Sequence, residues 1–467
     1  MTSMIITKDS APFIQDYITS LNEILKSHPQ GQELSRLQSM WLQFVILGML
    51  VTNSLCWSKF ERFGLQEYGK SALCWMFRKA SIFWEYLLQA SVIHVLSSYN
   101  VKVGTLVIDD SDRERSKNVT QIGMAHKIKD KKTGGYFLGQ NIVFLILVAE
   151  EITVPVGFRF YEPDPELTAW RKEEARLAKK KVEKKYRPCK PEKNPDYPTK
   201  IELAEQLVEE FAANHKSCRV KAVVADAAYS TDDFLTKCRE YCPDAQIISE
   251  IKNNQLVFFN NRYTKVSDVF ANFMGTTEEV TLRANKQQIT YRSAKLKLKA
   301  HDGKKRYIIA LKYDGESEYR YLVASDMTWR DIDVIKTYAN RWLVEVFIQD
   351  WKSYEGWGQL AKQRGCIGAD RGVLLSLLCD HALHFHQAQL SSFKNNEPAI
   401  TTGSLREKVM LESLIAFIEN IVASADPKSV FEQCSEQLSE LFELKTSLKH
   451  LRSFKNMAET VVVNQKT

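Results

Sequence analysis

Four residues of unusual chemical type recur at helical spacing in residues 331–354, DIDVIKTYANRWLVEVFIQDWKSY. They are Tyr338, Arg341, Glu345 and Lys352. At about 100° per residue, these spacings place the four side chains within an arc of roughly 60°, which predicts one polar ridge on a single helix. Most of the remaining residues are apolar, and a helix of this kind is usually buried. A buried carboxylate and two cations must then be paired, bound to a metal or directed at a charged ligand.

Two further acids follow short apolar stretches that read as strands. Asp109 follows TLVI, with Asp110 and Asp112 close behind it, and Asp226 follows VKAVVA. Carboxylate oxygens are the ligands that Mg²⁺ and Mn²⁺ favour, and two such ions about 3.5–4 Å apart stabilise both the attacking and the leaving oxygen of phosphodiester cleavage. Spacing alone does not bring these acids together. For each of them, the simpler interpretation is a capping or surface carboxylate, and for Arg341 with Glu345 it is an intrahelical ion pair.

The elements that would position these residues change character along the chain. Residues 1–100 show apolar positions at three- and four-residue spacing, which predicts helices. Residues 101–251 alternate strands and helices, 252–325 are rich in strands, 326–393 return to the first pattern, and 394–467 are helical. We therefore predict an α/β fold whose catalytic core is a mixed sheet with a β-rich insertion, between a helical N-terminal domain and a helical C-terminal region. The N-terminal domain is either a helix-turn-helix-like DNA-end-binding domain or a plain helical bundle.

The positive charge of the chain is concentrated in one segment. Residues 171–200 hold 12 Lys and Arg and five Asp and Glu, whereas the rest of the chain is balanced at 52 of each. Four prolines, at 188, 191, 195 and 198, interrupt the second half of this segment, so only its first half is predicted to be helical. A clustered basic segment favours a polyanion partner, and a solvated surface loop is the alternative.

Composition excludes several other classes of protein. The nine cysteines show neither a zinc-ribbon spacing nor a disulfide framework. The N-terminus lacks the pattern of a secretory signal, and the apolar run 41–57 is too short for a bilayer span, so we expect a core helix there and no membrane partner. His381, His384 and His386 cannot all lie on one helix face, which argues against a zinc site.

The motifs together resemble a DDE transposase of the bacterial insertion-sequence-four type. The family signature Tyr-x2-Arg-x3-Glu-x6-Lys is matched by Tyr338, Arg341, Glu345 and Lys352. LVIDDSD is similar to the strand that carries the family's first acid, and VVADAAY is similar to the strand that carries the second. The resemblance covers roughly residues 100–390.

The resemblance implies an RNase H-like catalytic core in which Asp109, Asp226 and Glu345 hold two Mg²⁺ ions, with Mn²⁺ as a substitute. Tyr338, Arg341 and Lys352 are then similar to the residues that grip phosphates beside the cleaved DNA end. The implied activity is metal-dependent cleavage at transposon ends and strand transfer into target DNA, by a homodimer when bound to double-stranded DNA, in the bacterial cytoplasm with the nucleoid. The choice of Asp109 rests on its place directly after the apolar strand.

Two other functions share these features. A repurposed sequence-specific DNA-binding protein without cleavage activity would keep the fold and the basic segment but would not need all three acids. A host nuclease of the same fold would keep the acids but would cut DNA without regard to inverted repeats. The terminal repeats, the target sequence and the use of a hairpin intermediate have no visible signature in the sequence.

Overall fold

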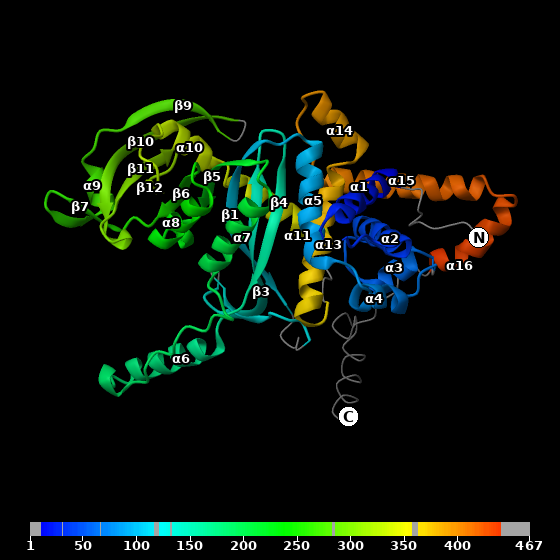
Figure 1. Cartoon of the computed structure of the whole chain (residues 1–467), viewed down its shortest axis with the longest axis horizontal. Coiled ribbons are helices and arrows are strands. Elements are labelled where there is room, and N and C mark those ends of the chain that lie inside the picture. The colour runs from blue at the N-terminus through cyan, green and yellow to red at the C-terminus, as the bar shows by residue number, and fades with distance from the viewer. Residues whose placement is uncertain are drawn as a thin grey trace, which may run out of the picture.

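A computed structural model of the chain describes residues 11–439, apart from residues 30, 66, 116–120, 131–132, 283–284 and 357–362. Within these residues, one twelve-stranded mixed sheet forms the centre of the molecule, and its order is β2-β3-β1-β5-β6-β12-β11-β10-β7-β8. The strand β4 pairs with β3, and β9 pairs with β10. Figure 1 shows the sheet on one side of the molecule and most of the N- and C-terminal helices on the other.

The strands alternate with helices over the first half of the sheet and then follow one another directly. Their bounds are β1 (Val103–Glu114), β2 (His126–Lys129), β3 (Tyr136–Val148), β4 (Thr153–Tyr161), β5 (Arg219–Ala225), β6 (Gln246–Ile251), β7 (Leu256–Phe259), β8 (Arg262–Lys265), β9 (Thr276–Leu282), β10 (Asn285–Leu298), β11 (Lys305–Tyr313) and β12 (Arg320–Ala324).

Five strands, in the order β4-β3-β1-β5-β6, make the part of the sheet that carries the predicted acids. The strands β3 and β4 form a hairpin, and β3 runs antiparallel to β1. The strands β1, β5 and β6 are parallel, because α7 (Lys200–Asn214) leads into β5 and α8 (Asp232–Tyr241) leads from β5 to β6. The two stretches that the sequence predicts as strands are therefore paired neighbours in the sheet, with residues 105–108 opposite 222–225.

The first of these strands is longer than its apolar residues indicate. We predicted that it ends at Asp109, but β1 continues to Glu114, with Asp109 opposite Phe144 and Glu114 opposite Gly139 of β3. The pairing with β5 stops earlier, at Ile108 opposite Ala225. The polar residues therefore stay in a strand because the long β3 supplies hydrogen-bond partners that no local pattern reveals.

The strands of the β-rich region 252–325 extend the same sheet. Its last strand, β12, pairs antiparallel with β6, and β11, β10 and β7 follow outward. One short helix in this region, α9 (Val266–Ala271), was not predicted. Its buried residues, Val266, Val269 and Phe270, close the outer end of one hydrophobic core.

Helices cover both faces of the sheet. Along β1, Leu106 and Ile108 point into one hydrophobic core with residues of α7 and α8, whereas Val107 points into the other core with residues of α10 (Asp331–Ala339) and α11 (Trp342–Tyr354). This alternation is the ordinary two-residue period of a strand. The same period directs Asp109 to the α11 face and Asp110 to the α7 face.

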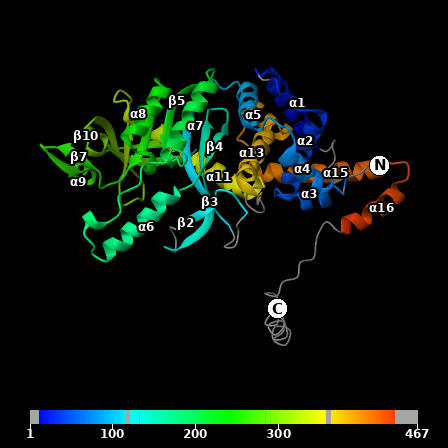
Figure 2. The ribbon, with the colours of Figure 1, turned by 60° about the horizontal axis from the view of Figure 1, so that its bottom comes forward.

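The remaining helices pack beside the sheet, and most of them contribute to the hydrophobic core that contains Val107. They are α1 (Pro12–Ser27), α2 (Arg36–Thr52), α3 (Trp57–Phe63), α4 (Lys70–Lys79), α5 (Trp84–Ser98), α13 (Gly365–Leu383), α14 (Gln387–Lys394), α15 (Thr402–Val422) and α16 (Pro427–Ser439), with α6 (Pro165–Lys179) projecting away from the sheet (Figures 1 and 2). The helix α2 includes most of the apolar run 41–57 and buries ten of its residues, as expected for a core helix. Residues 440–467, where further helix was predicted, lie outside the described residues.

Among the described helices, none alone is long and apolar enough to cross a membrane. The pair α2 and α3 meets those criteria only when the two helices, which are bent by 89° relative to each other, are counted together.

The predicted single helix 331–354 is divided in two. The helix α10 ends at Ala339 and α11 begins at Trp342. Across the junction, the backbone N–H of Arg341 donates to the carbonyl of Tyr338, and that of Val344 donates to the carbonyl of Arg341. These tighter i to i+3 bonds interrupt the α-helical ladder, so the signature residues are divided between two helices, with Tyr338 in α10, Glu345 and Lys352 in α11, and Arg341 at the junction.

A buried acid lies where α11 meets α13. Glu355, the C-cap residue of α11, is fully buried beside Asp380 of α13. Burial, together with the neighbouring Asp380 carboxylate, raises the pKa of Glu355 well above its ordinary value. Burial opposes ionisation of Asp380 as well, but His384 and His381 hold the pKa of Asp380 below its ordinary value. Glu355 is therefore the protonated member of the pair.

This pair predicts a pH-dependent stability. A raised pKa means that the stabilising contribution of Glu355 is complete below about pH 4.5, the ordinary pKa of glutamate, and is lost as the pH rises through its value in the folded protein. Glu355→Gln has no proton to lose. We expect the unfolding temperature of this variant, measured by calorimetry, to increase relative to that of the wild type as the pH is raised from 4.5 towards 10. The exposed Glu397→Gln is the control, and a difference that does not change with pH would contradict the assignment.

Candidate active site

Two of the predicted acids lie at the same edge of the parallel strands. Ile108 of β1 and Ala225 of β5 are the last paired residues of these strands, and Asp109 and Asp226 follow them directly. The strand period directs both carboxylates to the α10 and α11 side of the sheet. The two carboxylates are close enough to interact electrostatically, because the charge of Asp226 raises the pKa of Asp109. The structure therefore brings Asp109 and Asp226 together.

Glu345 is connected to Asp109 through the side chain of Arg341. The Arg341 guanidinium donates to Asp109 Oδ2 at 2.9 Å and to Glu345 Oε1 at 2.5 Å. The Asp109 side chain is only 16% exposed, whereas that of Glu345 is 52% exposed. We predicted that the four signature residues are buried, but the Glu345 side chain is half exposed. The arginine at the helix junction is the group that joins the first acid to the third.

The pKa of Asp109 reflects competing effects. The net result is a pKa raised to about 6: burial raises it most, the Arg341 guanidinium and the Asp110 backbone N–H lower it, and the carboxylates of Asp226 and Asp110 raise it. Asp109 Oδ1 accepts the Asp110 N–H at 2.8 Å. The pKa of Asp109 is raised even though a guanidinium is bound to the carboxylate, so the carboxylate is strongly desolvated. A further cation at this position would stabilise its ionised form.

The donor set fits a divalent metal by its chemistry, since all three side chains offer carboxylate oxygens. The arrangement fits it only in part. Among the described residues, no three His, Cys, Asp or Glu side chains are grouped so as to hold a metal ion. The Arg341 guanidinium lies between Asp109 and Glu345, so the predicted three-carboxylate cluster is not formed in this structure.

The neighbouring acids Asp110 and Asp112 point to the other face of β1. Lys200, the first residue of α7, lies 2.7 Å from Asp110 Oδ2, and Asn141 of β3 donates to both Asp110 and Asp112. These partners neutralise or satisfy the two carboxylates. The choice of Asp109 over its neighbours is therefore supported by the face on which each side chain lies.

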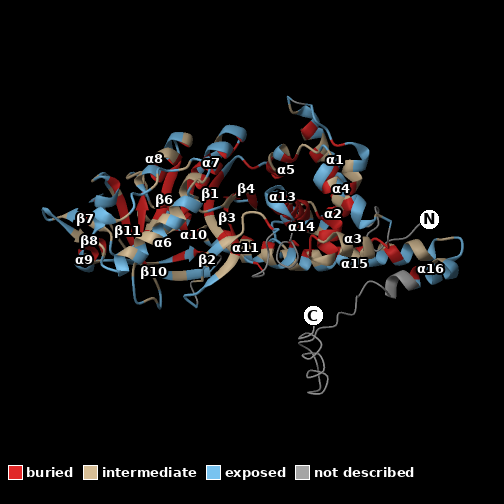
Figure 3. Cartoon of the chain, turned by 90° about the horizontal axis from the view of Figure 1, so that it is seen from below, coloured by how far each residue is buried: buried red, intermediate tan, exposed pale blue. Residues whose placement is uncertain are grey.

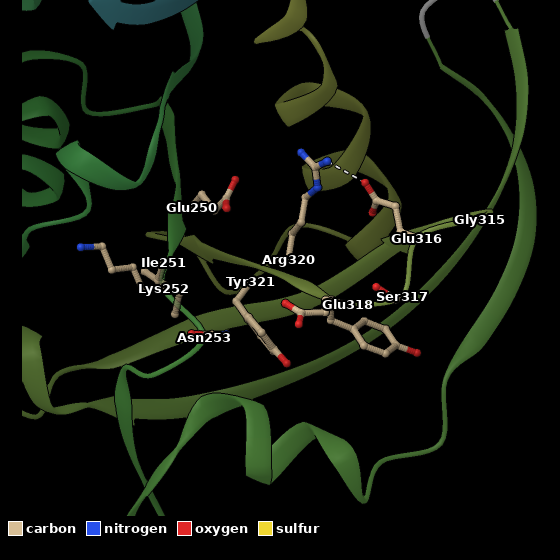
Figure 4. A pocket seen from close by; sticks show the side chains of 11 residues that line it. Glu250, Ile251, Lys252, Asn253, Gly315, Glu316, Ser317, Glu318, Arg320 and Tyr321 are labelled. Atoms are coloured by element: carbon tan, nitrogen blue, oxygen red, sulfur yellow. Dashed lines mark hydrogen bonds and ion pairs between the residues drawn. The ribbon is translucent and has the colours of Figure 1, made fainter. Parts of the chain in front are cut away.

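Tyr338 is buried and bound to an acid of the sheet. It is 4% exposed and donates its hydroxyl to Glu250 Oε2 of β6 at 2.9 Å. Glu250 is in turn one wall of a 530 Å³ cavity between β6 and the turn before β12, whose other side chains include Glu316, Glu318 and Arg320 (Figure 4). The cavity also contains Lys252, and Arg320 is bound to Glu316 at 2.6 Å, so its charged lining consists of three glutamates and two cations.

Lys352 has a cationic neighbour that the sequence analysis did not single out. Its ammonium donates to the backbone carbonyl of Asp112 at 2.8 Å, and burial, with the adjacent Arg113, lowers its pKa. Arg113 lies two strand positions beyond Ser111 and four beyond Asp109, on the same face of β1. Two half-buried cations side by side repel each other unless an anion joins them. The alternation of β1 would have revealed Arg113 if the strand had been predicted at its full length.

The basic segment forms a projecting arm, residues 165–199, which consists of α6, a 3-10 turn at Lys184–Tyr186 and an irregular return. No residue of α6 is buried. The arm is held by its own contacts: Trp170 Nε1 donates to the Pro188 carbonyl at 2.8 Å, and Arg187 binds Glu174 at 2.8 Å. Its first half is helical as predicted.

Seven of its cations make no ion pair with any described residue. They are Arg171, Lys172, Lys179, Lys180, Lys181, Lys184 and Lys190.

Comparisons with known proteins support a transposase domain in part of the chain. A search of the curated proteins gives no match. Among solved structures, the NurA nuclease from Sulfolobus solfataricus is 7% identical, with a TM-score of 0.24, over 51% of this chain and 72% of that one. The Drosophila P element transposase strand transfer complex is 9% identical, with a TM-score of 0.18, over 92% of this chain and 98% of that one. Structural likeness at this level carries no argument.

The family model described as the transposase DDE domain matches residues 193–363. The matched range contains Asp226 and all four residues of the signature, and Asp109 lies before it. It supports a transposase function, together with the DNA binding that such a function needs. Residues 193–363 of this chain are therefore similar to a transposase DDE domain.

Proposed function

We propose that this protein cleaves DNA at transposon ends and transfers the ends into target DNA, using Asp109, Asp226 and Glu345 as metal ligands. The observation that carries the proposal is the convergence of Asp109 and Asp226 at the end of β1–β5 pairing, with Arg341 joining Asp109 to Glu345. The strand order β4-β3-β1-β5-β6, with its antiparallel and parallel pairs, supports an RNase H-like core. The insertion-sequence-four type rests on the signature alone.

The carboxylates would hold two Mg²⁺ ions, or Mn²⁺, which supply charge stabilisation to the attacking and leaving oxygens of the phosphodiester. The residues of this chain have separate tasks. Asp109 and Asp226 present oxygens from two rigid strands, and Glu345 presents its own from α11. Arg341 competes with the metal ions for the carboxylates of Asp109 and Glu345. When the guanidinium is released from them, its two parallel N–H donors suit a phosphate.

Lys352 and Arg113 form the second phosphate-binding element of the proposal. They lie beyond Asp109 on the same face of β1, and neither has a carboxylate that fully neutralises it. A DNA phosphate placed against this pair would supply the counter-charge that burial and the neighbouring Arg113 leave Lys352 without. Tyr338 has a different role in the proposal: it is buried against Glu250 and positions the junction that carries Arg341.

The test uses DNA that carries the sequences flanking the gene of this protein. With Mg²⁺ or Mn²⁺, the wild type is expected to cut at the inverted repeats and to join the ends to a target plasmid, and the reaction should stop with EDTA. Binding without any cutting would favour the repurposed DNA-binding protein. Cutting of repeat and scrambled DNA at equal rates would favour the host nuclease.

The arm gives a further expected result. If it tracks a DNA backbone, its cations release counterions on binding, and each phosphate contact contributes about −0.9 to the slope of log affinity against log salt. We expect Lys180→Gln, Lys181→Gln and Lys184→Gln in one variant to reduce the slope by about two to three and to weaken binding of all DNA sequences alike. Fluorescence anisotropy at several salt concentrations measures both.

A matched variant carries Lys102→Gln, Lys216→Gln and Arg219→Gln, which are exposed at the opposite ends of β1 and β5 from Asp109 and Asp226. It removes the same charge and should leave the slope almost unchanged. Equal slopes for the two variants would return the arm to a solvated loop.

A further inference from the structure

Two lysines and two aromatic residues stand in one row across four neighbouring strands of the β-rich region. Lys305 of β11 is opposite Lys297 of β10, and Lys297 is opposite Phe258 of β7 on its other side. Phe258 is in turn opposite Tyr263 of β8. Residues directly opposite each other point to the same face, with Cβ atoms about 5 Å apart. The four side chains therefore form one continuous lysine–aromatic row.

The lysine–aromatic row is open to solvent. The aromatic residues Phe258 and Tyr263 are 38% and 46% exposed, and both lysines are exposed. Figure 3 shows β7 and β8 at one end of the molecule, where exposed residues predominate. Val257, next to Phe258, points into the hydrophobic core that contains α7 and α8. The row consequently lies on the other face of the sheet, which is the face of α10 and Asp109.

Positive charge surrounds the aromatic pair. The row is flanked on the same face by three more exposed lysines, Lys265, Lys295 and Lys299. None of the five lysines makes an ion pair with any residue that the structure describes, whereas Lys304 and Arg306 nearby both bind Asp232. The nearest acid along β10 is Asp331, which already accepts from Ser293 at 2.9 Å. The surface therefore has an excess of cations.

The structure of the sheet does not require the two lysines of the row. Like charges directly opposite each other destabilise a sheet, and Lys297 and Lys305 are such a pair. Lysines on an edge strand prevent pairing with another chain, which accounts for Lys265 on β8. The strands β10 and β11 are inner strands, so this reason does not apply to Lys297 and Lys305. An anion between the two ammonium groups would relieve their repulsion.

We propose that the lysine–aromatic row binds single-stranded nucleic acid, with phosphates against Lys297 and Lys305 and a base stacked on Phe258. Cations that follow the backbone, beside aromatic rings that stack the bases, let a protein bind single strands without reading their sequence. The rings of Phe258 and Tyr263 meet edge to face, with 5.5 Å between their centres, so they do not stack on each other. Lys299, whose ammonium lies 5.4 Å from the centre of the Tyr263 ring, supplies a third cation beside the aromatic pair.

The exposed rings favour a single strand over two other polyanions. The bases of a duplex are stacked on one another, whereas those of a single strand offer their faces to an aromatic side chain. An acidic protein segment would satisfy the lysines but would leave the rings without a stacking partner. The inference goes beyond the proposed function and needs no cleavage. Its test is made without metal, so a failure to bind single strands and a failure to cleave are separate results.

The experiment compares two probes by fluorescence anisotropy. One is a thymidine oligonucleotide of about ten residues, and the other is an abasic deoxyribose-phosphate chain of the same length. Backbone contacts elsewhere on the protein, including those proposed for the arm, act on both probes alike, so the difference between the probes reports stacking. The wild type should bind the thymidine probe more tightly.

Phe258→Leu keeps an apolar side chain on β7 but removes the ring. It should bind the thymidine probe about tenfold more weakly and the abasic chain as the wild type does. Phe258→Trp should bind the thymidine probe at least as tightly as the wild type, which a purely structural role of the ring does not predict. Tyr136→Leu, at an aromatic residue of β3 that is 70% exposed, is the control and should change neither affinity.

Lys297→Gln with Lys305→Gln should weaken both probes alike, because the lysines contact phosphates. Two lost contacts reduce the slope of log affinity against log salt by about 1.4 on single strands. Lys102→Gln with Lys216→Gln removes the same charge from exposed positions ahead of β1 and β5 and should leave the slope unchanged.

Photocrosslinking locates the contact. A thymidine probe that carries bromodeoxyuridine should crosslink to the peptide that contains Phe258, as identified by mass spectrometry. Equal wild-type affinity for the two probes would overturn the proposal, as would full thymidine binding by Phe258→Leu or crosslinks confined to other peptides. A duplex or a polyglutamate peptide that binds more tightly than the thymidine probe, with the same dependence on Phe258, would assign the surface to that partner instead.

Discussion

Asp226→Ala is expected to bind the flanking inverted repeats as the wild type does and to lose cleavage and strand transfer. Asp226 lies at the end of β5 beside Asp109, and removing it takes away one of the two carboxylates that the sheet holds together. The transition-state stabilisation that metal ligands support is worth several kcal/mol, so the rate should fall by a factor of about a thousand or more. Binding should survive because phosphate contacts by Lys and Arg dominate DNA affinity.

The measurement compares gel-shift affinity with the rate of Mg²⁺-dependent nicking. Asp110→Asn is the sharpest control, because Asp110 is the residue next to Asp109 but points to the opposite face of β1, towards Lys200 and Asn141. It should cleave at close to the wild-type rate. If Asp226→Ala cleaves normally, or if Asp110→Asn is the inactive variant, the assignment of the acids is wrong.

Arg341→Lys should lower cleavage by about ten- to a hundredfold although the charge is kept. Arginine binds Asp109 and Glu345 with two different nitrogens of one planar group, and a lysine ammonium is a single point that does not reproduce this fork. The loss should be larger in the cleavage rate than in the DNA dissociation constant, since one phosphate contact is a small part of the affinity.

Arg330→Lys offers the matched control. Arg330 is also an arginine bound to a nearby acid, Asp333, but its side chain is 78% exposed, ahead of α10 and away from Asp109. Its replacement by lysine should change neither rate nor affinity. Wild-type cleavage by Arg341→Lys would remove the role given to the guanidinium fork.

Residue periods in the sequence were sufficient for the local elements around the site. Alternation and helical spacing predict three features: the apolar parts of the strands before Asp109 and Asp226, the helices that precede β5 and β6, and the β3–β4 hairpin. They are predictable because each depends on residues within about 15 positions of one another. The direction of β5 parallel to β1 then follows, since β4 runs parallel to β1 and the helix α7 crosses from β4 to β5.

The details of the site depended on contacts between distant residues. The strand β1 continues to Glu114 because β3 pairs with it, the helix 331–354 breaks beside Arg341, and Tyr338 finds Glu250, which is 88 positions away. Lys352 meets Arg113 only because α11 lies along β1.

Sequence alone therefore determined most of the elements that hold the candidate residues, and it predicts that those residues carry the chemistry. Tertiary structure decided where each side chain points, because burial and pairing with a distant element cost or return more free energy than local propensity does.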